Sequence, residues 1–415
     1  MADFGGADLD AFRGEVRAWL AENYPAELKQ AKPPSDPEAV WGGRAFVGSD
    51  DPQIRWMRAM ASRGWTAPTW PAAYGGGGLT AEQARVLEKE LSAAGCRPPL
   101  MSFGLWMLGP VLLEYASEAQ KQEHLPKIAR GEIRWCQGYS EPGAGSDLAS
   151  LQTRCEDKGD HWLINGQKIW TSYANRADWC FCLVRTDTSK KHEGISFVLI
   201  DMASPGVETR PIKLISGESP FCETFFVDVK VPKDNLVGQL NGGWTIAKRL
   251  LQFERANISG GFVGGGGAAG GAAGDLVEIA RRNVGVDGTG ALADADLRTR
   301  IVRSRMDSQA FFLTLSRINA EARASNGPSA ATSIIKYAAA TFAQERSELV
   351  VEALGAAGLG WEGEGFSAAE RQATRGWLRS KANSIEGGTS EVNLNVIAKR
   401  VLGLPDPVRG KEANG

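Results

Sequence analysis

The sequence predicts an α+β protein in which a block of helices, a block of strands and a second block of helices follow one another. Apolar residues recur at helical spacing up to Ile128, β-prone segments follow Trp135, and helical spacing returns from Trp244 onward. Such segregated blocks favour separate domains over an alternating, doubly wound sheet. Because 415 residues exceed one compact core, we expect two or three domains. The three blocks give the ranges 1–134, 135–240 and 241–415.

The composition excludes several classes of protein. With 43% hydrophobic and 23% charged residues, the chain is neither disordered nor fibrous. Its 47 Lys and Arg against 49 Asp and Glu give a net charge of -2, so we expect no nucleic-acid and no membrane partner. The N-terminus lacks the apolar core of a signal peptide, and the uncharged stretch Ser259–Gly274 is too weakly apolar to span a bilayer. We therefore expect a cytoplasmic protein.

The cysteines and histidines argue against metal chemistry and triad chemistry. Six cysteines form no CxxC pair and have no histidine at metal-ligand spacing, and the chain has only three histidines. We expect reduced cysteines and no metal site.

The first block contains three segments with helical spacing. They are the stretch with Leu9, Phe12, Val16 and Trp19, then Glu82–Leu91, then Val111–Ile128. Between them, Asp36–Asp50 is predicted to be a loop, and Trp65–Leu79 holds too many prolines and glycines for a long helix.

The middle block contains short strand candidates. Asn165-Gly166 lies between two β-prone flanks, which predicts a two-residue hairpin turn. Further strands are predicted at Phe181–Thr186, Gly194–Met202 and Cys222–Pro232.

The last block contains one long helix and one ambiguous stretch. Apolar residues from Ile335 to Ala353 share one helix face. Nine glycines lie between Ser259 and Asp275, and each costs a helix about 1 kcal/mol relative to alanine. The stretch is therefore either a flexible linker or a helix that neighbours approach closely.

Four motifs in order carry a resemblance to a known family. They are Glu141–Asp147 (EPGAGSD), Asn165–Lys168 (NGQK), Trp170, and Gly387–Glu391 (GGTSE). Together they resemble the acyl-CoA dehydrogenases, and within that family the large subunit of pimeloyl-CoA dehydrogenase. The resemblance implies an N-terminal helical domain, a middle β domain and a C-terminal four-helix bundle, and it favours the helical interpretation of the glycine stretch.

The resemblance also implies an activity. Family members bind FAD non-covalently and convert an acyl-CoA thioester to the trans-2-enoyl-CoA, as in the β-oxidation of fatty acids. They pass the electrons to an electron-transfer flavoprotein or a similar acceptor. The length, branching or ring content of the acyl chain is not implied.

Site residues follow from the matching motif positions. Tyr139 and Ser140 are expected at the pyrimidine edge of the flavin, Trp170 over the ring, and Ser172 near its N5. Thr389 and Glu391 are expected at the adenine-side phosphates and ribose. Of the remaining candidates, Gly145 and Gly355 are expected to contact the cofactor, and Arg255 the substrate. Ser146 is expected to contact both the acyl-CoA and the cofactor.

Two departures affect the contact to FAD across a subunit interface. The family's Arg-x-x-Phe-Gly element corresponds to Ala280–Gly285, which has no Phe, so Arg281 or Arg282 is the candidate for the pyrophosphate. The Gln-x-x-Gly-Gly element appears as Glu352–Ala356, in which a carboxylate replaces the amide.

The reaction needs a carboxylate base for the α proton and a donor for the thioester oxygen. Many members carry the base immediately before Gly-Thr-Ser, but that position is Gly387 in this chain. Others carry it on a preceding helix before an Arg, where this chain has Glu254-Arg255. We therefore expect Glu254 to be the base and the backbone N–H of Gly387 to be the donor, with Glu386 as the alternative base.

Two other functions compete with dehydrogenation. A flavin monooxygenase or oxidase uses the same fold, although such members commonly lack a base at both positions. A non-catalytic subunit that completes the FAD site of a partner would explain the missing Phe. The assembly is accordingly expected to be a homodimer or homotetramer, or a heterotetramer with a smaller homologous subunit.

Overall fold

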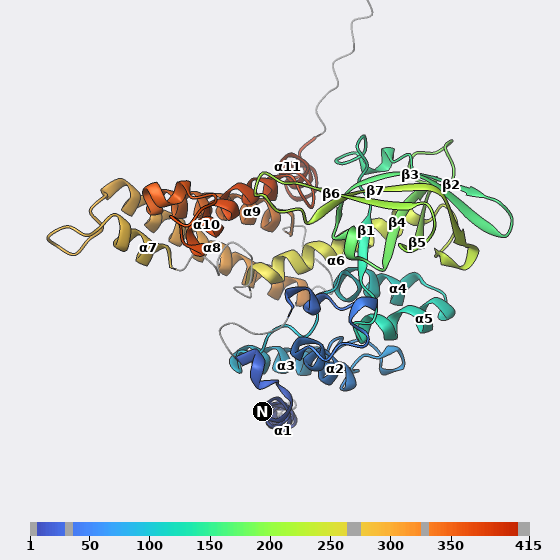
Figure 1. Cartoon of the computed structure of the whole chain (residues 1–415), viewed down its shortest axis with the longest axis horizontal. Helices are drawn as coiled ribbons and strands as arrows, with labels where there is room; N and C mark the ends of the chain where they lie inside the picture. The colour runs from blue at the N-terminus through green and yellow to red at the C-terminus, as the bar shows by residue number, and fades with distance from the viewer. Residues whose placement is uncertain (1–5, 30–35, 264–274, 325–331, 406–415) are drawn as a thin grey trace, which may run out of the picture. The chain divides into compact units, whose positions relative to one another are not determined.

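The computed structural model describes residues 6–29, 36–263, 275–324 and 332–405. The chain forms two compact units (Figure 1). The first unit comprises residues 1–212 and 220–253, and the second comprises residues 213–219 and 254–415. Among the helices described, none has a stretch long and apolar enough to cross a lipid bilayer.

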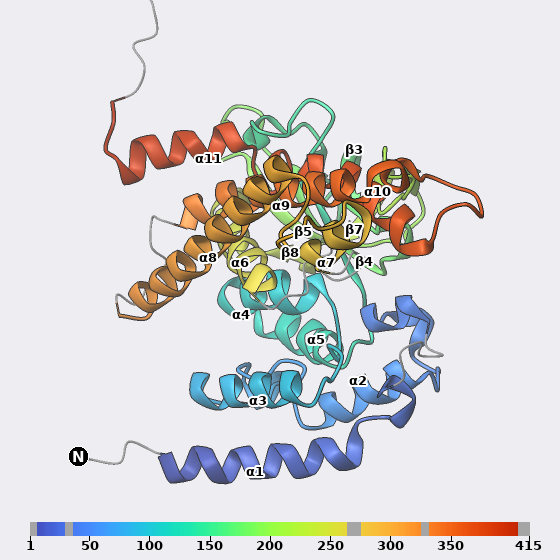
Figure 2. The ribbon, with the colours of Figure 1, turned by 90° about the vertical axis from the view of Figure 1, so that its left-hand side faces the viewer.

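The first unit begins with helices packed on one another. Helices α1 and α3 lie side by side (Figure 2), and Leu20 and Leu87 join Trp56 and Trp65 in a shared core. The helices of this unit that precede the sheet are α1 (Gly6–Asn23), α2 (Pro52–Ser62), α3 (Ala81–Ala93), α4 (Gly109–Tyr115) and α5 (Glu118–Ala129).

The predicted segment Val111–Ile128 is two helices rather than one. Helix α4 ends at Tyr115, and Ser117 is the N-cap of α5. The Ser117 hydroxyl accepts a hydrogen bond from the amide of Gln120, whose side chain accepts one from the amide of Ser117. This capping box starts a new helix within a continuous apolar pattern. The predicted loops at 36–50 and 65–79 contain only short 3-10 turns.

One mixed sheet follows the helices. Its strand order is β6-β7-β3-β2-β4-β5-β8, and β1 pairs with β4 in parallel. Strands β4 and β5 are buried on both faces, with α4 and α5 covering the side of Phe181 and Phe197 (Figure 1). The strands are β1 (Trp135–Gly138), β2 (Arg154–Asp157), β3 (His161–Ser172), β4 (Trp179–Arg185), β5 (Ile195–Asp201), β6 (Val207–Ile212), β7 (Phe221–Pro232) and β8 (Leu236–Val237).

The hairpin turn predicted at Asn165-Gly166 is wrong. Both residues lie inside β3, and the β2–β3 connection is the three-residue segment 158–160, which ends five residues before Asn165. The register of β3 against β7 shifts between Ile164 and Gly166, where Asn165 lies opposite two residues of β7, Val227 and Asp228, so the dipeptide runs through β3 opposite a bulge in β7. The Asn165 side chain donates to the Asp228 carboxylate over 3.0 Å and accepts from the Asp228 amide over 2.9 Å. A Cβ at Gly166 would come within 2.6 Å of the Thr153 backbone, so glycine is required by a close approach rather than by a turn.

The second unit is helical. Helix α9 spans the long helix predicted from Ile335 to Ala353 and confirms it. The helices that follow the sheet are α6 (Gly243–Val263), which runs from the first unit into the second, α7 (Leu276–Asn283), α8 (Ala295–Ala324), α9 (Thr332–Leu354), α10 (Ala368–Ser380) and α11 (Ser390–Val396). Residues 259–263 of the glycine stretch are helical, and residues 264–274 lie outside the described residues.

The order of helices, sheet and helices confirms the predicted fold class. The boundary proposed between residues 134 and 135 lies where the chain passes from α5 to β1, inside the first unit. The three proposed domain ranges stay predictions.

Candidate functional site

A buried ion pair joins two of the sequence motifs in the first unit. Lys168 lies on β3 and is fully buried. Its Nζ donates to Glu141 Oε1 over 2.8 Å and to the backbone oxygen of Tyr139 over 3.1 Å. The EPGAGSD motif and the NGQK motif are therefore fixed to each other by a charge-assisted hydrogen bond.

The Glu141 carboxylate has further donors. It accepts hydrogen bonds from the amides of Gln152, over 2.6 Å, and Thr153, over 2.9 Å. Burial disfavours the charged form, but the Lys168 ammonium and these hydrogen bonds outweigh it and hold the pKa of Glu141 below its usual value. The pair is thus ionised and hydrogen-bonded, which makes burial of both charges tolerable.

A second bulge, which lies in β3 itself, contains Trp170. The register against β7 shifts between Lys168 and Thr171, and the amide of Ile169 donates instead to the backbone oxygen of Ser140 over 2.9 Å. Trp170 has a φ of 60°, and 52% of its surface is exposed. Its ring contacts the Phe221 ring edge-on, with centroids 6.1 Å apart. A strained backbone therefore holds a large aromatic side chain at the surface of the unit, a combination found at functional sites.

The structure thus brings together the candidates at 139–140 and 168–172. Ser140 and Ser172 are half-buried, whereas Gly145 and Ser146 are exposed. The Tyr139 ring is buried in the core beside Phe181, so the backbone of Tyr139, rather than its ring, is what this residue offers to a ligand.

In the second unit, α9 holds the segment before Gly387. The Lys336 ammonium donates to the backbone oxygen of Asn383 over 2.5 Å, and the Gln344 amide donates to the backbone oxygen of Ser380 over 3.1 Å. Gly387 and Gly388 follow with φ values of 62° and 93°, a conformation that favours glycine.

The residues after the two glycines begin α11. Thr389 is the N-cap of this helix, and its hydroxyl accepts from the amide of Val392 over 3.2 Å. Glu391 is exposed in the first turn. The segment therefore presents two flexible glycines, a hydroxyl and a carboxylate in five residues.

The two candidate bases differ in their surroundings. Glu254 is half-buried on α6. Glu386 is exposed, and its Oε2 lies 2.8 Å from Arg379 Nη2. The side chain of Arg255 lies outside the described residues.

The next residues belong to the two segments that depart from the family pattern. Arg281 and Arg282 are exposed on α7. Glu352, which replaces an amide, forms an ion pair with Arg300 of α8 at 2.7 Å. Gly355 follows α9 with a φ of 57° and is exposed.

The sequence interpretation gave Glu141 and Lys168 no role of their own. A usable signal was present, because Trp162, Ile164 and Lys168 alternate onto the buried face of one strand. A lysine on a buried face needs a carboxylate partner, and the other motif supplies one.

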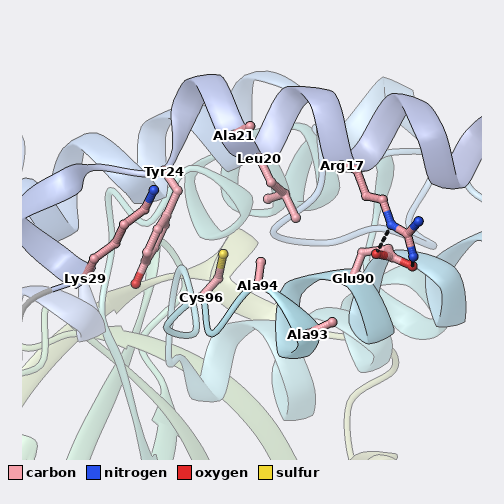
Figure 3. Close-up of a pocket in the computed structure, with 9 residues that line it drawn as sticks. All are labelled: Arg17, Leu20, Ala21, Tyr24, Lys29, Glu90, Ala93, Ala94 and Cys96. Carbon is pink, nitrogen blue, oxygen red and sulfur yellow. Dashed lines mark hydrogen bonds and ion pairs between the residues drawn. The ribbon is translucent and has the colours of Figure 1, made fainter.

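The described residues hold no cluster of three or more His, Cys, Asp or Glu side chains that could bind a metal ion. A pocket of about 320 Å³ lies between α1, α3 and the residues that follow each of them (Figure 3). Arg17 and Glu90 close one end with an ion pair of 2.7 Å, and Lys29 lies at the other. None of the predicted site residues lines this pocket.

Comparison with known proteins decides the family. Three family models match the chain: acyl-CoA dehydrogenase N-terminal domain over residues 7–132, middle domain over 136–229 and C-terminal domain over 241–402. The chain belongs to the acyl-CoA dehydrogenase family. It is an oxidoreductase of that family, as the motifs predicted.

Individual relatives agree. Acyl-CoA dehydrogenase IpdE1 of Mycolicibacterium smegmatis is 36% identical over 415 residues, covering 97% of this chain and 100% of that protein. The solved Tcur3481-Tcur3483 steroid ACAD has a TM-score of 0.74 at 30% identity, covering 98% of this chain and 100% of that one. The ChsE4-ChsE5 complex from Mycobacterium tuberculosis has a TM-score of 0.72 at 28% identity, with the same coverage.

Proposed function

We propose that this protein binds FAD and removes hydrogen from the α and β carbons of an acyl-CoA thioester. The observation that carries the proposal is the rigid joint between the two middle motifs, with Trp170 held outward beside it. The residues around Trp170 suit the flavin ring of FAD, which is planar and has polar edges. Trp170 offers an apolar face, and the hydroxyls of Ser140 and Ser172 offer hydrogen bonds on the neighbouring segments.

The chain's own residues supply the acid–base chemistry. Glu254 takes the α proton, and the backbone N–H of Gly387 donates to the thioester oxygen on which negative charge develops. Gly387 has no side chain, so a carboxylate from another helix can use that space. FAD, when bound, supplies the acceptor for the β hydride.

Further residues hold the two ligands. Thr389 and Glu391 contact the adenine-side phosphates and ribose, together with the glycines before them, and Gly355, which has no side chain, brings its backbone close to the cofactor. Gly145 and Ser146, which are exposed on the EPGAGSD loop, contact the cofactor and the acyl-CoA. Arg255, next to the base, contacts the substrate.

The test has two parts, one for the cofactor and one for the substrate. The purified protein should be yellow and should release FAD, not FMN, on denaturation. A panel of straight, branched, dicarboxylic and steroid-linked acyl-CoAs should then be screened anaerobically for bleaching of the flavin. The steroid-linked member is included because one similar structure is described as a steroid ACAD. A protein that takes up no FAD, or that no acyl-CoA bleaches, contradicts the proposal.

An oxidase or monooxygenase activity is the competing chemistry. It predicts rapid oxygen consumption and release of hydrogen peroxide by the reduced protein. A dehydrogenase instead passes electrons faster to an electron-transfer flavoprotein or an artificial acceptor than to oxygen.

A second candidate role concerns assembly. Glu352 is engaged by Arg300, and the Arg281–Arg282 region has no Phe, so the usual cross-subunit contact to FAD is altered. Two similar solved structures each carry a pair of protein names. The chain would then form a heterotetramer with a smaller homologous subunit, and its flavin content would rise on adding that partner.

A further inference from the structure

A buried arginine lies under the turn that follows Trp170. Arg134 is 3% exposed, and its guanidinium carbon lies 5.0 Å from the Trp41 ring centroid and 5.2 Å from the Tyr173 ring centroid. The two rings are themselves 5.0 Å apart. One cation therefore contacts the faces of two aromatic rings, an attraction that burial strengthens.

Tyr173 needs such support because its backbone is strained. Its φ is 52°, in the left-handed region that a bulky residue rarely adopts. Its amide donates to the backbone oxygen of Pro220 over 2.7 Å, and its own oxygen accepts from the amide of Arg176 over 2.9 Å. This residue turns the chain directly after Ser172, so the direction of the Ser172 and Trp170 side chains depends on it.

Glu38 completes the arrangement. Its Oε2 accepts from Arg134 Nη1 over 2.8 Å, and its Oε1 lies 2.5 Å from Arg176 Nη1. Arg176 closes the short turn that begins after Tyr173. One carboxylate thus joins the cation beneath the Tyr173 ring to the turn that follows it.

The backbone of Arg134 is fixed as well. Its amide donates to Asp178 Oδ2 over 2.8 Å, and its oxygen accepts from the amides of Asp178 and Trp179. The main chain from which the guanidinium extends is therefore held by hydrogen bonds to Asp178 and Trp179.

We infer that Arg134 and Glu38 are positioning residues that hold the turn 170–173 in its flavin-binding geometry. This inference rests on the proposed function, since it assigns a role toward FAD. Neither side chain is required to touch the cofactor. They act through Tyr173, whose strained conformation fixes the directions of Trp170 and Ser172.

The test compares Arg134→Met with Arg44→Met. Removing the Arg134 guanidinium leaves Glu38 paired with Arg176, so the fold should tolerate the change. Arg44 is the control, because its guanidinium forms an ion pair with Asp201 at 2.8 Å in the same unit and lies over the Trp179 ring. The readouts are the dissociation constant of FAD from the apoprotein, the visible circular dichroism of the bound flavin, and the melting temperature.

Arg134→Met should weaken FAD binding about tenfold and change the flavin dichroism, a size set by loss of a buried cation–π contact. Arg134→Lys should restore most of the affinity, because it returns a cation to the rings. Arg44→Met should lower the melting temperature without either flavin effect. Glu38→Gln is the second variant, and it should weaken FAD binding in the same direction.

The outcomes separate the two proposals. A wild-type protein that binds no FAD overturns both the proposed function and this inference. If wild type binds FAD, the inference alone is overturned when Arg134→Met and Glu38→Gln bind it equally well with an unchanged spectrum. It is also overturned when Arg44→Met reproduces their effect, since that would show general destabilisation. Should Arg134→Met fail to fold, Glu38→Gln decides by the same criterion, because FAD binding and a flavin spectrum equal to those of wild type overturn the inference.

Discussion

Lys168 Nζ lies 2.8 Å from Glu141 Oε1 in the interior of the first unit, and the two residues are 27 positions apart in the chain. Each belongs to a different sequence motif. The same ammonium also donates to the backbone oxygen of Tyr139, so one buried charge fixes the loop that leads to Ser140. These two motifs, which are separate in the sequence, are therefore joined by one buried ion pair.

Replacing Lys168 with Met should destabilise the protein severely. The change leaves Glu141 as a buried carboxylate without its cation, and breaking a buried pair costs about 3–5 kcal/mol. Chemical denaturation of the apoprotein measures this loss. Glu141→Gln/Lys168→Met, which removes both charges, should recover much of it. A Lys168→Met protein as stable as wild type would show that the pair contributes nothing.

The same pair predicts a dependence of stability on pH. The pKa of Glu141 is lowered in the folded protein from an ordinary value of 4.5. Its contribution is therefore fully present above pH 4.5, and it is lost as the pH falls through the lower folded-state pKa. Glu141→Gln should flatten the acid limb of a plot of unfolding free energy against pH. An identical acid limb in the variant would exclude Glu141 as its source.

The order of blocks was predictable because it depends on local apolar spacing. Helix α9 has strong helical periodicity and β7 largely alternates, whereas β4 and β5 are continuous runs of apolar, β-prone residues. The Asn165-Gly166 dipeptide was misinterpreted for a physical reason. The dipeptide that favours a tight turn instead runs through β3 opposite a bulge in β7, and the bulge residue that binds Asn165, Asp228, is 63 residues away.

The candidate site likewise has some features that the sequence predicts and others that it does not. The motif positions of Trp170 and Thr389 could be named from the sequence, but the strain at Trp170 could not, since it results from a register shift against β7. The role of Arg134 depends on Glu38, which is 96 residues away, and on a ring that follows the second motif. Contacts between residues so far apart in the sequence produce no local pattern of apolar residues.

The cysteines provide a further test. Of the six, Cys136, Cys155, Cys180, Cys182 and Cys222 are buried, and only Cys96 is partly exposed, at the edge of the pocket in Figure 3. Burial raises the pKa of Cys155 to about 12 and also raises that of Cys96. Because the thiolate is the reactive form, the native protein should react slowly with a disulfide reagent, at one thiol. The unfolded protein should react at all six. Rapid modification of more than one native thiol, or a native Cys96→Ser variant that reacts as wild type does, would contradict this.

Helix α8 carries an apolar stripe suited to a subunit interface. Val302, Met306 and Leu313 share one helix face, and Met306 and Leu313 are 67% and 63% exposed. Exposed apolar side chains gathered on one helix face make this face a candidate for a subunit interface. Met306→Asp with Leu313→Asp should therefore reduce the oligomer size measured by light scattering. Arg303→Asp is the control, since it adds a carboxylate about 100° around the same helix from Val302. An unchanged mass in the double variant, or a monomeric wild type that is fully active, would exclude this interface.

The choice between Glu254 and Glu386 gives the sharpest test of the proposed chemistry. Glu254→Gln keeps the shape of the side chain but removes its basicity, so reduction of the flavin by acyl-CoA should slow by about 10²–10⁴-fold. FAD content should not change, because the proposal gives Glu254 no part in binding the cofactor. Glu386→Gln is the matched control. Its carboxylate is already bound to Arg379 at 2.8 Å on the surface, so its loss should change the rate little. Anaerobic stopped-flow measurement of flavin reduction separates the two variants without any contribution from the electron acceptor. If Glu386→Gln shows the large loss and Glu254→Gln does not, the base is Glu386.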